Sequence, residues 1–171
     1  MHNKFGQDII GDFHRSIKQQ AINIMLEEWD KIYLLGEVRK VADSTLKTDY
    51  NYTTKSSLYY VASKTQSIIR YANLNNKNAV SKALKEDVFK LACTVFDLYK
   101  AAEAIEAGRT WDAIALTIEK SGSFEVTHYH NFGLRYKALS EKFFIDTEFL
   151  WASDIFGYEP TSADLAKQQL R

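Results

Sequence analysis

Residues 80–107, VSKALKEDVFKLACTVFDLYKAAEAIEA, carry the clearest structural pattern in the chain. Apolar residues recur there at intervals of three and four, and a second apolar row lies beside the first on a helical wheel. The two rows are Val80, Leu84, Val88, Leu91, Val95, Leu98, Ala102 and Ile105, and Phe89, Ala92, Phe96 and Tyr99. Together they are wider than a coiled-coil seam. The pattern therefore predicts a central helix packed by neighbours on several sides, and it allows a homodimer without requiring one.

The rest of the chain is interpreted in the same way. Glycine and proline are scarce, with seven and one among 171 residues, which favours long helices over short strands joined by turns. Apolar spacing predicts four helices, over residues 7–29, 58–72, 110–118 and 134–151, and a continuation of the first of them to residue 41. A loop is expected over 43–57, and a short last helix is capped by Thr161 or Ser162. The segment 124–132 is ambiguous, because it also alternates like a strand. The sequence thus predicts a single all-α domain over residues 1–171, a helical bundle of about five to seven helices.

Composition narrows the class of protein. The chain is 46% hydrophobic and 26% charged, which is a globular profile, and 22 basic residues balance 22 acidic ones. A net charge of zero argues against nucleic-acid binding driven by bulk charge. The single cysteine, Cys93, excludes an internal disulfide. No secretory signal and no apolar run of the roughly 20 residues that a membrane span needs are present. We therefore expect a cytoplasmic protein with no membrane partner.

One segment has the spacing of a metal site. Glu125 and His128 are three residues apart, and on a helix such a pair leaves the same face and can share an ion. Ferritin-like di-iron bundles use two Glu-x-x-His pairs and two further glutamates, whereas this chain contains one such pair. The missing second pair argues against a di-iron centre.

Two further glutamates, Glu103 and Glu106, precede that pair across a predicted hairpin. The four positions resemble the motif of MazG-type nucleotide pyrophosphohydrolases, helical enzymes that hold magnesium with Glu-x-x-Glu on one helix and Glu-x-x-Asp on the next. The resemblance is confined to these positions and departs at His128, where an oxygen ligand is expected. With His128 and His130 present, zinc, manganese or iron would fit better than magnesium. The simpler interpretation is packing and capping, so no cofactor is expected.

Two other groups of residues are candidates for binding. Basic and aromatic side chains around a predicted turn, which could hold single-stranded nucleic acid by charge and stacking, are Arg70, Tyr71, Lys77, Lys82 and Lys85. A solvated hairpin tip has the same composition, and we favour that interpretation. Aromatic residues in the last third, which could line an apolar pocket or a protein interface, are Tyr136, Trp151, Phe156 and Tyr158. The simpler interpretation is that they fill the core of the domain.

No complete catalytic constellation emerges from the sequence. Cys93 falls on the polar side of its helix and far in sequence from any histidine, and the chain lacks a glycine-rich phosphate loop. The leading hypothesis is therefore a non-enzymatic binding or adaptor protein that acts through a protein partner or self-association. Two alternatives stay open: a metal-dependent hydrolase that uses the Glu/His set, and a small-ligand binder with an aromatic pocket in the C-terminal half.

Overall fold

The computed structural model describes residues 4–42, 50–74, 79–105 and 111–168. The chain divides into two compact units, Met1–His130 and Asn131–Arg171, and each is described by itself. The elements of the first unit are α1 (Lys4–Asn23), β1 (Trp29–Ala42), β2 (Tyr50–Ala62), β3 (Ile68–Arg70), the 3-10 turn η1 (Tyr71–Asn73), α2 (Ala79–Ile105), β4 (Ala113–Glu119) and β5 (Phe124–Tyr129). The single-domain prediction stays a prediction, because two compact units can still fold as one cooperative domain.

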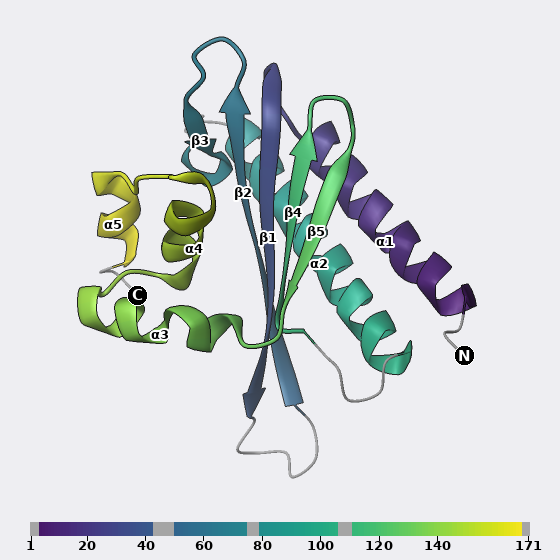
Figure 1. The fold of residues 1–171 in the computed structure, drawn as a ribbon. Helices are drawn as coiled ribbons and strands as arrows, with labels where there is room; N and C mark the ends of the chain where they lie inside the picture. The colour runs from purple at the N-terminus through teal and green to yellow at the C-terminus, as the bar shows by residue number, and fades with distance from the viewer. Residues whose placement is uncertain (1–3, 43–49, 75–78, 106–110, 169–171) are drawn as a thin grey trace. The chain divides into compact units, whose positions relative to one another are not determined.

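The first unit is built on a five-stranded antiparallel sheet with the strand order β3-β2-β1-β4-β5 (Figure 1). The two longest strands, β1 and β2, pair along their whole length from Trp29–Ala62 to Ala42–Tyr50. β4 pairs with β1 from Lys31 to Glu37. The centre of the sheet is therefore the three-strand region where β2, β1 and β4 lie side by side.

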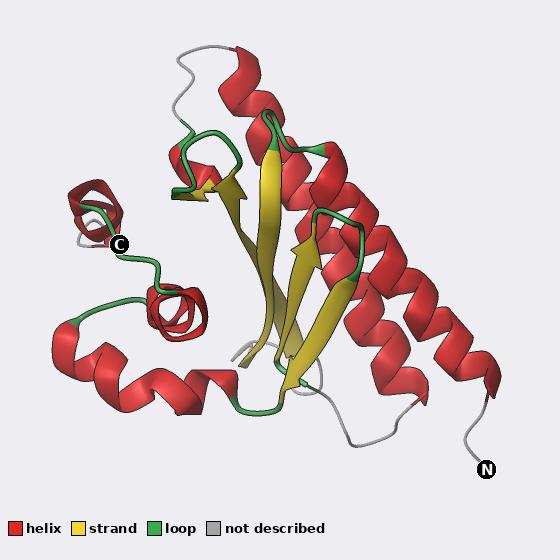
Figure 2. Ribbon diagram, turned by 45° about the horizontal axis from the view of Figure 1, so that its top comes forward, coloured by secondary structure: helices red, strands yellow, loops and turns green. Residues whose placement is uncertain are grey.

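Helices α1 and α2 lie next to each other on one face of this sheet (Figure 2). Strand alternation sends every second side chain toward them, as with Ile32, Leu34 and Val38 of β1. From the helices, Ile17 of α1 and residues of α2 such as Leu98 pack in the same core. These side chains are almost fully buried and form one continuous core between the helix pair and the sheet.

The second unit is a small set of three helices, α3 (Phe132–Phe143), α4 (Thr147–Phe156) and α5 (Ser162–Gln168). Helix α4 ends at Gly157, which adopts the left-handed conformation that a C-terminal glycine permits. Helix α5 begins with a reciprocal cap: the Thr161 hydroxyl accepts from the amide of Asp164, and the Asp164 carboxylate accepts from the amide of Thr161. The short terminal helix and its Thr161 cap agree with the sequence.

The prediction of an all-α helical bundle is wrong. A helix does form in the expected region, as α2 over Ala79–Ile105, but it packs on a sheet and is not the centre of a bundle. Residues 106–107 of the prediction lie outside the described residues. The helix expected to continue to residue 41 stops at Asn23, and residues 29–42 form β1. The helices expected over 58–72 and 110–118 are mainly strands, and part of the loop expected over 43–57 belongs to β2.

The expected long helix over residues 134–151 is also corrected, because it is divided into α3 and α4 by a turn at Phe144. The ambiguous segment 124–132 contains β5 and the beginning of α3. Among the described residues, no helix combines the length and the apolar character that crossing a bilayer requires.

Candidate functional site

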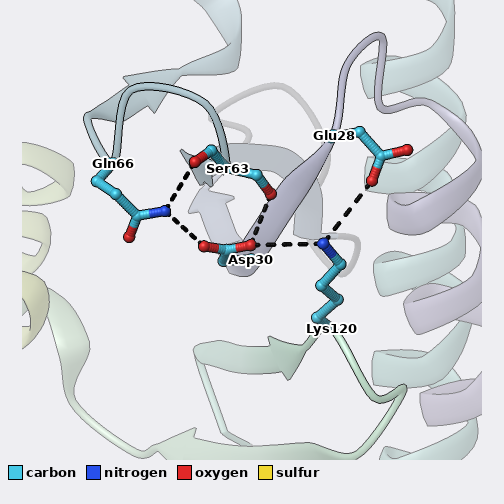
Figure 3. A network of polar contacts seen from close by, with 5 residues as sticks. All are labelled: Glu28, Asp30, Ser63, Gln66 and Lys120. Carbon is cyan, nitrogen blue, oxygen red and sulfur yellow. Dashed lines mark hydrogen bonds and ion pairs between the residues drawn. The ribbon is translucent and has the colours of Figure 1, made fainter.

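A polar network joins three connecting segments at one end of the sheet (Figure 3). The carboxylate of Asp30, at the start of β1, accepts hydrogen bonds of 2.6 Å from the Ser63 hydroxyl and from the Gln66 amide, both in the β2–β3 turn. The Lys120 ammonium, in the β4–β5 turn, lies 3.7 Å from Asp30 and 3.9 Å from Glu28. The hydrogen bond from Gln66, followed by that from Ser63, lowers the pKa of Asp30. Because the partners come from three different segments of the chain, the network is suited to holding the turns in place.

A row of aromatic rings crosses the interface between the helix pair and the sheet. The ring of His14 on α1 lies 5.6 Å from that of His128 on β5, measured between centroids. His128 in turn lies 5.8 Å from Trp111, and Trp111 meets Tyr99 of α2 edge to face at 5.4 Å. Ring pairs at these separations are favourable. The two histidines therefore belong to the packing between α1 and the sheet.

His14 is held in its neutral form. Burial, followed by the nearby charges of His128 and Arg15, lowers its pKa from 6.5 to about 4. Its Nε2 atom is buried and has no hydrogen-bond partner within the described residues. Protonation would place a cation where burial disfavours it, so the neutral ring is part of the folded state.

We expect the protein to lose stability as the pH falls from 6.5 toward 4, the window set by the unfolded and folded pKa values of His14. In that range the unfolded chain binds a proton that the folded chain does not, so the unfolded state is favoured at lower pH. Allowing for partial exposure, the loss is about 2–3 kcal/mol. In His14→Phe this portion of the loss should disappear. Urea denaturation at several pH values measures it, and identical pH profiles for the two proteins would refute the assignment.

The structure does not give the proposed metal ligands the arrangement that their spacing assumed. Residues 124–129 form a strand, on which positions three apart point to opposite faces, so Glu125 and His128 diverge. Glu103 lies on α2 and forms ion pairs with Lys100 at 3.2 Å and Lys40 at 3.7 Å. His130 follows β5 and is exposed. The premise of a shared helical face is therefore wrong.

Within the described ranges, no three histidine, cysteine, aspartate or glutamate side chains gather as a ligand set. Glu106 lies outside those ranges. A zinc, manganese or iron site that includes Glu106 stays a prediction.

The candidates for nucleic-acid contact differ in burial and do not share one exposed surface among the described residues. Tyr71, in η1, is buried and its hydroxyl donates to the carbonyl of Ile24 at 3.0 Å, so its ring is a core residue rather than a stacking platform. Arg70 ends β3 and is half-buried, whereas Lys85 is exposed on α2. Lys77 lies outside the described residues, as does the side chain of Lys82.

The candidate aromatic residues in the last third of the chain are mostly buried. Tyr136, Trp151 and Tyr158 are buried and Phe156 is half-buried. The hydroxyl of Tyr136 donates to Asp154 at 3.0 Å, and that of Tyr158 donates to Asp164 at 2.6 Å. The rings of Trp151 and Phe156 pack edge to face. These side chains are therefore engaged within the second unit.

The exposed apolar side chains are different ones, which the sequence analysis did not select. Of the nine large apolar residues exposed among those described, six belong to the second unit: Leu134, Leu139, Phe143, Phe144, Ile155 and Leu165. One signal could have found part of this set. Asp146 and Glu148 are acidic residues on either side of Thr147, a pattern typical of the start of a helix. A helix that starts at Thr147 places Phe144 in a turn rather than in a helix interior.

A protein-family model described as Immunity protein YezG-like matches residues 10–170. The match therefore spans both compact units and nearly every element of the fold. No curated protein matches the chain.

Proposed function

Since the chain belongs to the YezG-like immunity protein family, we propose that it is a non-enzymatic binding protein that neutralises a protein toxin by forming a complex with it. The observation that carries the proposal is the extent of the family match, which covers residues 10–170. The match therefore concerns the whole fold rather than one short segment. The sequence analysis led to a non-enzymatic binding protein with a protein partner, and the proposal adds that this partner is a toxin.

A binding mechanism makes definite demands on the complex. The toxin is neutralised only while it is bound, so the immunity protein must be present in at least equal amount and must dissociate slowly. Complexes between nuclease toxins and their immunity proteins reach dissociation constants of about 10⁻¹³ to 10⁻¹⁶ M, among the tightest known. A standard protein interface buries about 800 Å2 on each partner. The proposed function therefore calls for a surface of that size with apolar residues at its centre.

The experiment is a titration of toxin activity. The probes are purified protein toxins from the organism that encodes this chain, each held at a fixed concentration. We expect residual activity to fall linearly and to reach zero at one molecule of chain per molecule of toxin, because binding is stoichiometric. Complete inactivation by a small fraction of that amount would show an enzyme. Full toxin activity at a large excess of the chain, with no complex on gel filtration, would overturn the proposed function.

A further inference from the structure

Three apolar side chains are exposed where α3 ends and the chain turns toward α4. Leu139 and Phe143 are four residues apart and so share one face of α3, where they are 48% and 54% exposed. Phe144 follows directly and is 88% exposed. We call these three residues the α3–α4 tip. Single apolar residues on a surface are ordinary, whereas neighbouring ones that include two phenyl rings are a candidate for an interaction site.

The backbone of the tip is strained in a way that the fold does not need. Phe144 has φ 54° and ψ 42°, the left-handed conformation in which glycine or asparagine ends most helices without cost. A bulky residue there is a true outlier. Its amide donates to the carbonyl of Ser140, and the Ser140 hydroxyl donates to the carbonyl of Ile145 at 2.7 Å. These bonds fix the turn, yet the phenyl ring itself is left in water. Folding alone would favour glycine at this position.

A cation borders the tip. Helix α3 carries Arg135, Lys137 and Lys142, of which Arg135 lies 3.7 Å from Asp154 and Lys137 lies 3.9 Å from Glu141. The Lys142 ammonium lies 5.2 Å from the centroid of the Phe143 ring, beside the apolar centre. An apolar centre with a cation at its edge is complementary to an apolar pocket with a carboxylate at its edge.

We propose that the α3–α4 tip is the central contact of the toxin interface, and that it enters an apolar pocket with an acidic rim on the toxin. The inference rests on the proposed function and adds the place and chemistry of the contact. A lipid surface could also take up phenyl rings beside lysines. The toxin is favoured because the family relation is to immunity proteins. Membrane binding is an outcome of the test below.

The tip is tested by Phe144→Gly and Phe144→Asn, which remove the ring while keeping a residue suited to the left-handed turn. The matched control is Phe89→Ser, because Phe89 is 68% exposed on α2, outside the tip. Binding to the purified toxin is measured by calorimetry. We expect both Phe144 variants to weaken binding by about 30-fold or more, as for a hot-spot residue. The Phe89 control should bind within about 2-fold of the original protein.

A second pair of variants tests the charge. Lys142→Glu should slow association with the toxin by about 10-fold at low salt, and high salt should reduce the difference, because a rim charge acts mainly on the encounter rate. Lys64→Glu, an exposed lysine of the β2–β3 turn, is its control and should leave the rate unchanged. Equal rates for both variants would contradict an acidic rim.

The outcomes separate the two proposals. If the unaltered chain does not bind the toxin, the proposed function fails. If it binds, but the Phe144 variants bind as tightly as the unaltered chain, the tip is not the interface and the inference alone is overturned. Binding of the chain to vesicles of anionic phospholipid is measured as the alternative. Binding to them that is lost in Phe144→Gly, together with unchanged toxin binding, would assign the tip to a membrane. Because glycine relieves strain, the melting temperature of Phe144→Gly should not fall.

Discussion

Gly36→Val is expected to lower the free energy of unfolding by about 3 kcal/mol, because the position has no room for a side chain. Gly36 lies on β1 opposite Ser56 of β2 and Ile114 of β4. A Cβ atom there would approach the Val95 methyl carbons of α2 to 2.7 and 2.9 Å, and a methyl carbon of Ile114 to 3.2 Å. Real Cβ contacts are not that short, so the helix would have to move away from the sheet. Urea denaturation measures the loss.

The control for this substitution is Gly133→Ala on α3. A Cβ atom at Gly133 would meet nothing within 4 Å, and alanine suits a helix better than glycine. Its stability should be unchanged or slightly raised. A Gly36→Val protein as stable as the Gly133→Ala protein would mean that α2 does not pack against the centre of the sheet.

Leu98→Ala is expected to cost about 2–5 kcal/mol, because it leaves a cavity in the core between α2 and the sheet. Leu98 has no exposed surface and belongs to the main apolar cluster. Phe89→Ala on the same helix removes a larger side chain, but one that is mostly in water, and should change stability by less than about 0.5 kcal/mol. Guanidinium denaturation of the two variants gives the comparison. Similar losses for both would show that the inner and outer faces of α2 are wrongly assigned.

The sequence predicted α2 because its apolar spacing is regular over 27 residues, a length at which helical periodicity has no competitor. The same spacing rule did not predict the strands, and the reason is physical. Leu58, Val61 and Ile68 have intervals of three and seven that fit a helix, but the face that meets the helices is made by Leu58, Tyr60 and Ala62. The intervening positions are apolar as well, and such a strand gives no clean alternation. Clusters of Tyr and Val, with their preference for strands, were the better guide.

The scarcity of glycine and proline was also misread. Long strands need few turns, and β1 and β2 run for 14 and 13 residues each. The same low count that suggested long helices is therefore compatible with a sheet of long strands.

The candidate site could be predicted only in part. The Glu125–His128 pair was derived from a helical spacing, so its geometry was lost once that segment proved to be a strand. The α3–α4 tip depends on the backbone conformation of Phe144, which no pattern of residue types reports directly. A protein-binding surface has no fixed motif comparable to a set of metal ligands, because complementarity depends on the partner. The family relation therefore came from the full chain and not from any short stretch.

Hydrogen exchange of the chain with and without saturating toxin is the most direct test of the whole account. We predict slower exchange of the backbone amides over residues 139–146 in the complex, with smaller changes across the described parts of residues 1–130. Unaltered exchange throughout would contradict toxin binding. Slowed exchange confined to the helix pair or the sheet would contradict the α3–α4 tip as its site.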